Sequence, residues 1–427
     1  YGLVGSEMCI RDSVGVATAV CAGGPGALFW MVVAAFLGMA TKYSEGLLAV
    51  KYRTVAEDGH SLGGPFYYIE LGMGRNFKWL AKIFAFFGVC VGLFGIGTFS
   101  QVNGISSAVH GFFDPNDAFT VKILPFLGEY SWSVVIASLI LSFCVAAVLI
   151  GGVKRIASVS QIIVPFMAVI YFVFAVILIC CNITKVPAAF ATIVTSAFSP
   201  KAITGGAVGS MLIAMQKGVA RGIFSNEAGL GSAPIAAAAA QTNSPVRQGL
   251  VSMTGTFIDT IIICTLTGLS IVLTGAWQVE GLEGVQVTTY AFQHGLPFPA
   301  QFSSFILMLC LVFFAFTTIL GWDYYSERCL EYLSGGNMKH VKIFRWIYIL
   351  AVFIGPYMTV SAVWTIADIF NGLMAIPNMI ALFALSGVIV KETRAFFQHA
   401  KEEALAEHRS FEEVCEENLN EEEAPAN

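Results

Sequence analysis

The residues best suited to chemistry lie between positions 211 and 240, in the segment MLIAMQKGVARGIFSNEAGLGSAPIAAAAA. The polar side chains of Lys217, Arg221, Asn226 and Glu227 stand there among glycines, between two apolar stretches. This pattern predicts a membrane helix that is interrupted near its middle. An interrupted helix frees backbone N–H and C=O groups, which membranes tolerate only where they face protein or a watery cavity. Such groups can bind an ion or a zwitterion.

Side chains of the same segment could complete a binding site. The free backbone begins near Gly222, Phe224 could form a wall, and Asn226 offers an amide. The alternative is that Ser225 and Asn226 only cap the following helix. Charged groups inside lipid must be paired or face water, so we expect Arg221 to pair with Glu227. That ion pair would either act as a gate or only neutralise the two charges inside the membrane, and both interpretations stay open.

A second polar group lies in FAFTTILGW, at positions 314–322. Thr317 and Thr318 are neighbouring hydroxyls in an otherwise apolar stretch, and Phe314 lies one helical turn earlier. Two hydroxyl oxygens beside exposed carbonyls would suit Na⁺, but threonine hydroxyls in membrane helices also bond to their own helix carbonyls. Trp322, one turn further, would either restrict the pocket to small side chains or serve as ordinary packing or interface anchoring.

Three more charged residues fall within or beside apolar stretches. Asp259 stands at mid-span in TFIDTIIICTLTG, where an ionisable group is a candidate for function. It could relay a proton or ion, or make a structural bond to Thr260 or a neighbouring helix. Lys42 and Glu45 lie one helical step apart, and we interpret them as anchors at the inner membrane edge.

The composition fixes the class of protein. The 427 residues are 56% hydrophobic and only 12% charged, whereas a soluble domain carries about 25% charged residues. A helix needs about 20 apolar residues to cross a bilayer, and continuously apolar runs exclude a β-barrel. The sequence therefore predicts an all-α polytopic membrane protein with lipid as its solvent. The apolar windows are 27–50, 80–110, 132–152, 157–182, 205–222, 248–276, 300–326, 343–363 and 366–390.

Other functional classes find little support. The chain has no basic patch for nucleic acid, no evident surface for an obligate protein partner and no constellation of catalytic side chains at mid-span. We therefore expect no enzymatic activity and no organic cofactor. A passive channel would differ from a transporter in being unable to accumulate its solute.

Lysine and arginine are concentrated in alternate loops, which marks those loops as cytoplasmic. This places the C-terminal tail, residues 393–427, in the cytoplasm as an acidic and partly helical extension. Residues 14–182 and 205–392 each open with a glycine-rich interruption, CAGGPG in the first and RGIFSNEAGLG in the second. Two halves of five helices, each led by a broken helix, are typical of inverted repeats in secondary transporters. Residues 1–13 follow neither a signal-peptide nor a spanning pattern, so we expect a non-native or mis-joined start.

Several long strings resemble one known family. They are GGPGALFWMVVAAFLGMATKYSEGLLAVKYR (23–53), GGPFYYIELG (63–72), GVARGIFSNEAGLGSAPIAAAAA (218–240), GTFIDTIIICT (255–265), FFAFTTILGWDYYSERCLEYL (313–333) and NGLMAIPNMIAL (371–382). Over residues 14–392 the chain resembles the alanine/glycine:cation symporter family, the sodium:alanine symporters. The resemblance implies a leucine-transporter-type 5+5 inverted repeat in the plasma or inner membrane, with an additional leading helix.

One departure from the family stands at the N-terminus. The family has Gly-Thr-Gly-Asn-Ile-Ala-Gly directly before the VATA found here at 16–19, whereas this chain reads CIRDSVG. The first half of the first broken helix, which in the family offers backbone donors to the substrate carboxylate, therefore does not match. We expect an N-terminally truncated fold with an incomplete first helix.

The resemblance also implies roles for individual residues. It assigns Na⁺, the co-transported ion, to Phe314, Thr317 and Thr318. It assigns binding of the amino acid to residues at the interruptions and on the helices that face them: Gln101, Gly222, Phe224, Asn226 and Trp322. The expected function is sodium-coupled import of alanine and glycine by alternating access. The alternatives are a cation symporter of the same fold for another small solute, or coupling to H⁺.

Overall fold

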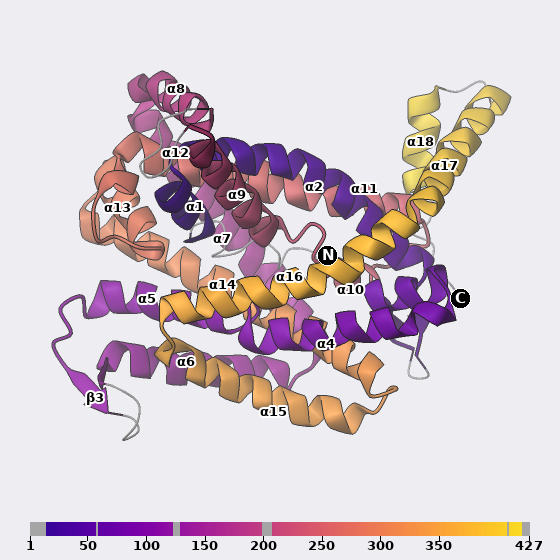
Figure 1. The fold of residues 1–427 in the computed structure, drawn as a ribbon, viewed down its shortest axis with the longest axis horizontal. Coiled ribbons are helices and arrows are strands. Elements are labelled where there is room, and N and C mark those ends of the chain that lie inside the picture. The colour runs from indigo at the N-terminus through magenta and orange to yellow at the C-terminus, as the bar shows by residue number, and fades with distance from the viewer. Residues whose placement is uncertain (1–13, 57–58, 123–128, 199–206, 408–409, 421–427) are drawn as a thin grey trace.

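The computed structural model describes residues 14–56, 59–122, 129–198, 207–407 and 410–420. The N-terminal segment 1–13 lies outside these residues. Seven helical stretches in the described chain are long and apolar enough to cross a bilayer (Figure 1), which confirms the prediction of an all-α polytopic membrane protein. They are Gly26–Lys51, Arg75–Phe113, Trp132–Leu149, Lys154–Cys181, Pro245–Thr274, Ala300–Leu333 and Ala362–Ala384.

The outer surface of the bundle is apolar, as a lipid-facing surface must be. Phe143, Ile162 and Phe383 are each 74% exposed. Exposed apolar area on this scale is rare on soluble monomers and marks contact with a membrane or partner.

The helices follow one another along the chain with short connections, and two of them contain a π-helical stretch. The α-helices are α1 Val16–Gly23, α2 Gly26–Lys51, α3 Pro65–Tyr67, α4 Lys78–Phe94, α5 Phe99–Phe113, α6 Trp132–Leu149, α7 Val153–Cys181, α8 Val186–Ala197, α9 Ala207–Asn226, α10 Ala233–Ala237, α11 Pro245–Thr256, α12 Thr265–Thr274, α13 Val285–Gly295, α14 Ala300–Leu333, α15 Met338–Ile354, α16 Val360–Ala384, α17 Ser386–Glu407 and α18 Phe411–Asn420. The π-helical stretches are Tyr68–Gly72 and Phe257–Cys264, and the 3₁₀ turns are Arg75–Phe77, Ile183–Lys185, Ala276–Gln278 and Gly355–Tyr357.

Two small antiparallel hairpins lie in loops between helices. The strands β1 (Thr54–Val55) and β2 (Ser61–Leu62) pair between α2 and α3. The strands β3 (Thr120–Lys122) and β4 (Glu129–Ser131) pair between α5 and α6.

Within the described residues, three helices are interrupted where glycine allows it. Between α1 and α2, Gly24 adopts a φ of 75°, so the predicted break at GGPG is confirmed. Between α4 and α5 the chain breaks at 95–98, where a Cβ on Gly97 would lie 2.6 Å from the Cβ of Trp322. Only glycine permits that approach. The third interruption separates α9 from α10.

Two of the predicted apolar windows divide differently in the structure. The window 343–363 is not one span, because α15 ends at Ile354 and a turn at Gly355–Tyr357 follows. Pro356 lacks the N–H that would continue the helix. The window 366–390 divides at Leu385, between α16 and α17.

The interior is built where interrupted and continuous helices pack together. The short α1 contacts α9, and α2 packs along α9 and α11. Helices α4 and α5 pack on α14, α6 lies beside α15, and α16 lies across α4 (Figure 1). Trp322 and Phe314 are among the largest fully buried side chains, so the middle of α14 is at the centre of the bundle.

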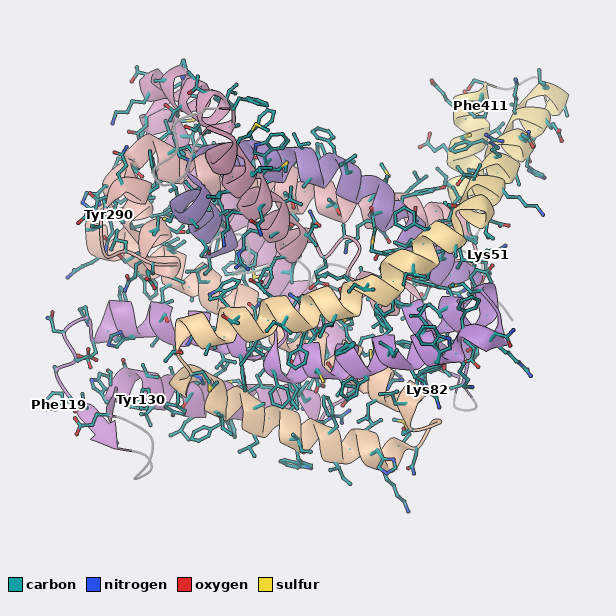
Figure 2. The ribbon with its side chains drawn as sticks, viewed as in Figure 1. Lys51, Lys82, Phe119, Tyr130, Tyr290 and Phe411 are labelled. Atoms are coloured by element: carbon teal, nitrogen blue, oxygen red, sulfur yellow. The ribbon has the colours of Figure 1, made fainter. Side chains whose placement is uncertain are left out.

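Helices α17 and α18, which contain the described part of the C-terminal tail, pack together and project from the bundle (Figure 1). Their base is attached to α2: Lys51 Nζ lies 2.6 Å from Glu392 Oε1, and the Tyr43 and Thr393 hydroxyls are 2.7 Å apart. Lys51 is seen at this junction in Figure 2.

Candidate functional site

The interruption of α9 has a defined backbone geometry. Helix α9 ends at Asn226, and Glu227, Gly229 and Gly231 follow with φ angles of 55°, 86° and 83°. These left-handed conformations stop helical hydrogen bonding, and α10 begins only at Ala233. A non-glycine residue at positive φ is uncommon, so Glu227 is held there by its surroundings. The predicted break in the middle of this segment is confirmed, but the free backbone begins after Asn226 and not near Gly222, which lies within α9.

The freed backbone is bound by buried polar side chains of two other helices. Gly231 N–H donates to Glu45 Oε1 of α2 at 3.2 Å, and Gly229 C=O accepts from Asn378 Nδ2 of α16 at 2.9 Å. Asn378 also donates to Glu45 Oε1 at 2.6 Å and accepts from the Tyr68 hydroxyl. The broken segment is therefore positioned by a network that joins α2 and α16.

This network corrects the interpretation of Lys42 and Glu45 as anchors at the membrane edge. Both side chains are fully buried, and Glu45 contacts the interrupted backbone directly. The spacing of Lys42 and Glu45 fits a buried pair and a snorkelling pair at the membrane edge equally well. The sequence alone does not show which face of α2 turns inward.

Glu227 connects the break to the centre of α14. The indole Nε1 of Trp322 donates to Glu227 Oε1 at 3.0 Å, and the Ser232 hydroxyl donates to Oε2 of the same carboxylate. Glu227 is fully buried and Trp322 is 1% exposed. On its other side Trp322 packs on Gly97, in the α4–α5 interruption. One side chain thus touches two interruptions.

The pairing predicted for Arg221 and Glu227 is wrong. Arg221 Nη1 and Nη2 instead lie 3.0 Å each from the two carboxylate oxygens of Asp368 on α16. The guanidinium also lies over the ring of Trp364, 4.4 Å from its centroid, and 5.5 Å from that of Phe224. Bidentate pairing with a carboxylate and stacking on aromatic rings are geometries that arginine favours.

Phe224 and Gly222 lie on the same turn of α9 as this pair. Phe224 is 3% exposed, and its ring centroid is 4.9 Å from that of Trp364. A Cβ on Gly222 would lie 3.2 Å from Cγ of Met31 on α2. Both predicted site residues therefore lie in the interior, beside α2 and α16.

Asn226 and Asp259 belong to one buried cluster. Asn226 Oδ1 accepts from Ala228 N–H at 3.0 Å, and its Nδ2 donates to Thr260 Oγ1 at 3.1 Å. The hydroxyls of Ser225 and Thr260 donate to Asp259 Oδ2 at 2.6 and 2.9 Å. Asn226 therefore stabilises a turn rather than capping α10. Of the two interpretations of Asp259, the structural bond to Thr260 and to a neighbouring helix is present.

The predicted sodium ligands lie one turn before Trp322 on α14. Thr317 Oγ1 donates to Phe314 O at 2.9 Å and Thr318 Oγ1 donates to the same carbonyl at 3.0 Å. All three residues are at most 2% exposed. Both hydroxyls thus bond to their own helix, and each oxygen keeps lone pairs that can still face a cation. Thr318 and Trp322 share a helix face, since residues four apart are neighbours.

Gln101 lies in the first turns after the α4–α5 interruption. Its Nε2 donates to Ile96 O at 2.9 Å. Its Oε1 is buried and has no hydrogen-bond partner among the described residues. A buried amide oxygen without a partner is a ready acceptor for an ammonium group.

Comparison with known proteins supports the family resemblance seen in the sequence. The model of the sodium:alanine symporter family matches residues 4–410. The chain belongs to the sodium:alanine symporter family. It is 46% identical over 395 residues to the sodium/alanine symporter AgcS of Methanococcus maripaludis, covering 91% of this chain and 81% of that protein. It is 54% identical over 389 residues to an uncharacterized transporter of Haemophilus influenzae, covering 91% and 80%. It is 36% identical over 398 residues to the amino-acid carrier protein AlsT of Bacillus subtilis, covering 93% and 79%.

Three residues that bind these buried groups were not predicted from the sequence: Asp368, Asn378 and Tyr68. Asp368 stands alone in the apolar run TIADIF, which is the signal that could have marked it. Asn378 and Tyr68 lie in strings that carry the family resemblance, NGLMAIPNMIAL and GGPFYYIELG. Their partners are far away in the sequence, so only the fold brings them to the interruption.

Proposed function

We propose that this protein is a sodium-coupled secondary symporter that imports alanine and glycine by alternating access. The observation that carries the proposal is the buried α9–α10 interruption beside Trp322 and the hydroxyls of α14. Interrupted backbone at membrane depth is the feature from which secondary transporters build midplane sites. Membership of a sodium:alanine symporter family supports the same substrates.

The proposed architecture is the leucine-transporter-type 5+5 inverted repeat, with residues 14–182 and 205–392 as the two halves and 393–427 as a cytoplasmic tail. Elements in corresponding positions of the two halves pack together: α1 with α9, α2 with α11, α4 with α14, and α6 with α15. Such pairing is expected when two halves are related by a pseudo-two-fold axis. It supports the repeat, and with it the rocking of one part against another.

The amino acid would bind between the α4–α5 and the α9–α10 interruptions. We assign its ammonium group to Gln101 Oε1, which is buried and accepts no hydrogen bond from the described residues. The backbone freed after Asn226 would face the rest of the zwitterion, Gly222 on the last turns of α9 would leave space beside it, and Phe224 and Trp322 would close the pocket. Two buried aromatic side chains leave room only for a small substituent, which favours alanine and glycine over larger amino acids.

Sodium would bind at the middle of α14, where the hydroxyls of Thr317 and Thr318 would turn from the Phe314 carbonyl so that all three oxygens face the ion. Thr318 shares a helix face with Trp322, so ion and substrate would stabilise the same position of α14. Binding of Na⁺ would then raise the population of the state that binds the amino acid, which is all that coupling requires.

The test is uptake of labelled alanine by the purified chain in proteoliposomes. An inward Na⁺ gradient should drive accumulation above the external concentration, and replacing Na⁺ by choline should abolish it. Unlabelled glycine should compete and glutamine should not. Accumulation that persists in choline and follows a pH gradient would indicate the H⁺-coupled alternative. Competition by a different solute alone would indicate another substrate.

A further inference from the structure

Asp323, on the turn of α14 that follows Trp322, has no assigned role. Its side chain is fully buried, and neither carboxylate oxygen has a hydrogen-bond partner among the described residues. Burying an ionised carboxylate without a partner is among the costliest arrangements in a protein, and more so within a membrane-spanning helix. This group must therefore carry a proton or hold a cation.

The neighbours of Asp323 come from three sides. Glu327 lies one turn further on α14 and is held by Arg345 of α15, whose Nε and Nη2 lie 2.7 and 2.9 Å from its two oxygens. Tyr348, one turn along α15, donates to Ile319 O at 2.8 Å and to Gly97 O at 3.3 Å. Helices α4 and α5 pack on the same part of α14. Asp323 therefore lies where α14, α15 and the α4–α5 interruption meet.

Counting charges shows that one carboxyl is in excess. The charged groups that act on Asp323 are Glu327 and Arg328 on α14 and Arg345 on α15. Arg345 is bonded to Glu327, and Arg328 Nη1 lies 2.5 Å from Glu331 Oε2. The imidazole of His60 also lies 3.2 Å from Glu331 Oε1, and while it is neutral two guanidiniums are matched by two glutamates. Asp323 is the third carboxyl of this group, and a single positive charge would neutralise it.

The chemistry favours a proton over a metal ion. A hard metal cation gathers several oxygens around it, while here the Tyr348 hydroxyl already donates to a backbone carbonyl and both Glu327 oxygens face Arg345. The guanidiniums of Arg328 and Arg345 would repel a metal ion at this position. A proton needs only one carboxyl oxygen.

We propose that Asp323 is a proton-binding site of the transport cycle. It holds a proton in the arrangement described here and releases it to water when α14 shifts against α15. The carboxylate left behind would then be stabilised by the positive charge of Arg345, which is bonded to Glu327 and acts electrostatically on Asp323. The coupling to transport rests on the proposed symport, but protonation of the carboxyl does not.

The first test is infrared difference spectroscopy of the purified chain during a pH titration, in water and in deuterium oxide. The wild type should show the carbonyl band of a protonated carboxyl, shifted by deuterium. Asp323→Asn should lose this band. Glu70→Gln, which removes a carboxylate outside the spans that pairs with Lys78, should retain it. A band unchanged in Asp323→Asn would overturn the proposal. Should that variant fail to fold, Asp323→Glu serves instead, and its band must move rather than stay in place.

The second test is the pH dependence of alanine uptake in proteoliposomes. Between about pH 5 and 9 the wild-type rate should change by up to about tenfold per pH unit over some interval, as expected for one proton. Asp323→Asn should vary by less than about twofold over that interval, and Glu70→Gln should follow the wild type. A wild-type slope in Asp323→Asn would refute the role in the cycle. Absence of uptake in the wild type would count against the symporter proposal, and the infrared band would still decide whether Asp323 is protonated.

Discussion

The hydrogen bond between Trp322 and Glu227 should contribute measurably to stability, and Trp322→Phe removes it. The bond joins a neutral donor to a buried carboxylate at 3.0 Å, and bonds to charged groups contribute about 1.5–3 kcal/mol. Replacing indole by phenyl also leaves a cavity beside Gly97, which adds about 1 kcal/mol. We therefore expect the free energy of unfolding to fall by about 2.5–4 kcal/mol in total.

The assay is equilibrium unfolding in mixed detergent micelles, arranged as a double-mutant cycle with Glu227→Leu. Both legs of the cycle contain the same indole-to-phenyl cavity, so the difference between them isolates the hydrogen bond. The matched control is Trp346→Phe on α15, because Trp346 is 62% exposed. Substitutions at such positions usually change stability by no more than about 0.5 kcal/mol.

The outcome of the cycle decides whether the bond positions the interruption. A coupling energy of about 1.5–3 kcal/mol would show that Trp322 holds Glu227 in place. A coupling below about 0.5 kcal/mol would refute the reasoning, since neighbours in a shared network normally exceed that value. In that case the left-handed conformation of Glu227 must be maintained by other contacts.

Three further predictions concern other parts of the molecule. Thr317→Ala combined with Thr318→Ala should abolish sodium-dependent alanine uptake while the protein stays folded, and unchanged uptake and sodium affinity would remove that site. Asp368→Asn should cost about 1–3 kcal/mol of stability, because it leaves the buried Arg221 without its carboxylate, and a loss below that range in thermal unfolding would contradict the pairing. Hydrogen bonds from a serine hydroxyl and a backbone N–H hold the pKa of Asp114 below its usual value. This carboxylate should therefore stabilise the β3–β4 hairpin above the ordinary aspartate pKa of about 4 and lose that effect as the pH falls through the lowered value. The protection of the hairpin amides from hydrogen exchange, measured relative to their intrinsic rates at each pH, should fall on acidification in the wild type, and Asp114→Asn should show low protection at every pH.

The interruptions were the part of the fold that the sequence predicted best. Glycine clusters at GGPG and around Glu227 are local signals, and the structure breaks the helices at both. The break at 95–98 was not predicted, although Gly95 and Gly97 are both present. Its cause is a close approach to Trp322, which lies more than two hundred residues further along the chain. A signal that depends on a distant side chain cannot be read from local composition.

The side-chain partners were predicted less well, for a related reason. Arg221 and Glu227 are close in sequence and opposite in charge, so a local pair was the natural expectation. The fold instead gives Arg221 the carboxylate of Asp368, and gives Glu227 the indole of Trp322. Charged groups inside a membrane bundle find partners on neighbouring helices. Which helices are neighbours is decided by packing, and no spacing rule contains that information.

The middle of α14 is where the proposed sites would communicate. Thr317, Trp322 and Asp323 lie within seven residues, and the six steps from Thr317 to Asp323 cover about 9 Å along a helix. Trp322 contacts both the α4–α5 and the α9–α10 interruptions, and Tyr348 bonds to a carbonyl of each of α14 and the α4–α5 interruption. A shift of α14 that moves the sodium ligands therefore also moves the Trp322 indole, which holds Glu227. It moves the Asp323 carboxyl as well, which we propose binds a proton. Coupling between ion, amino acid and proton then follows from the rigidity of one helix rather than from a chain of separate switches.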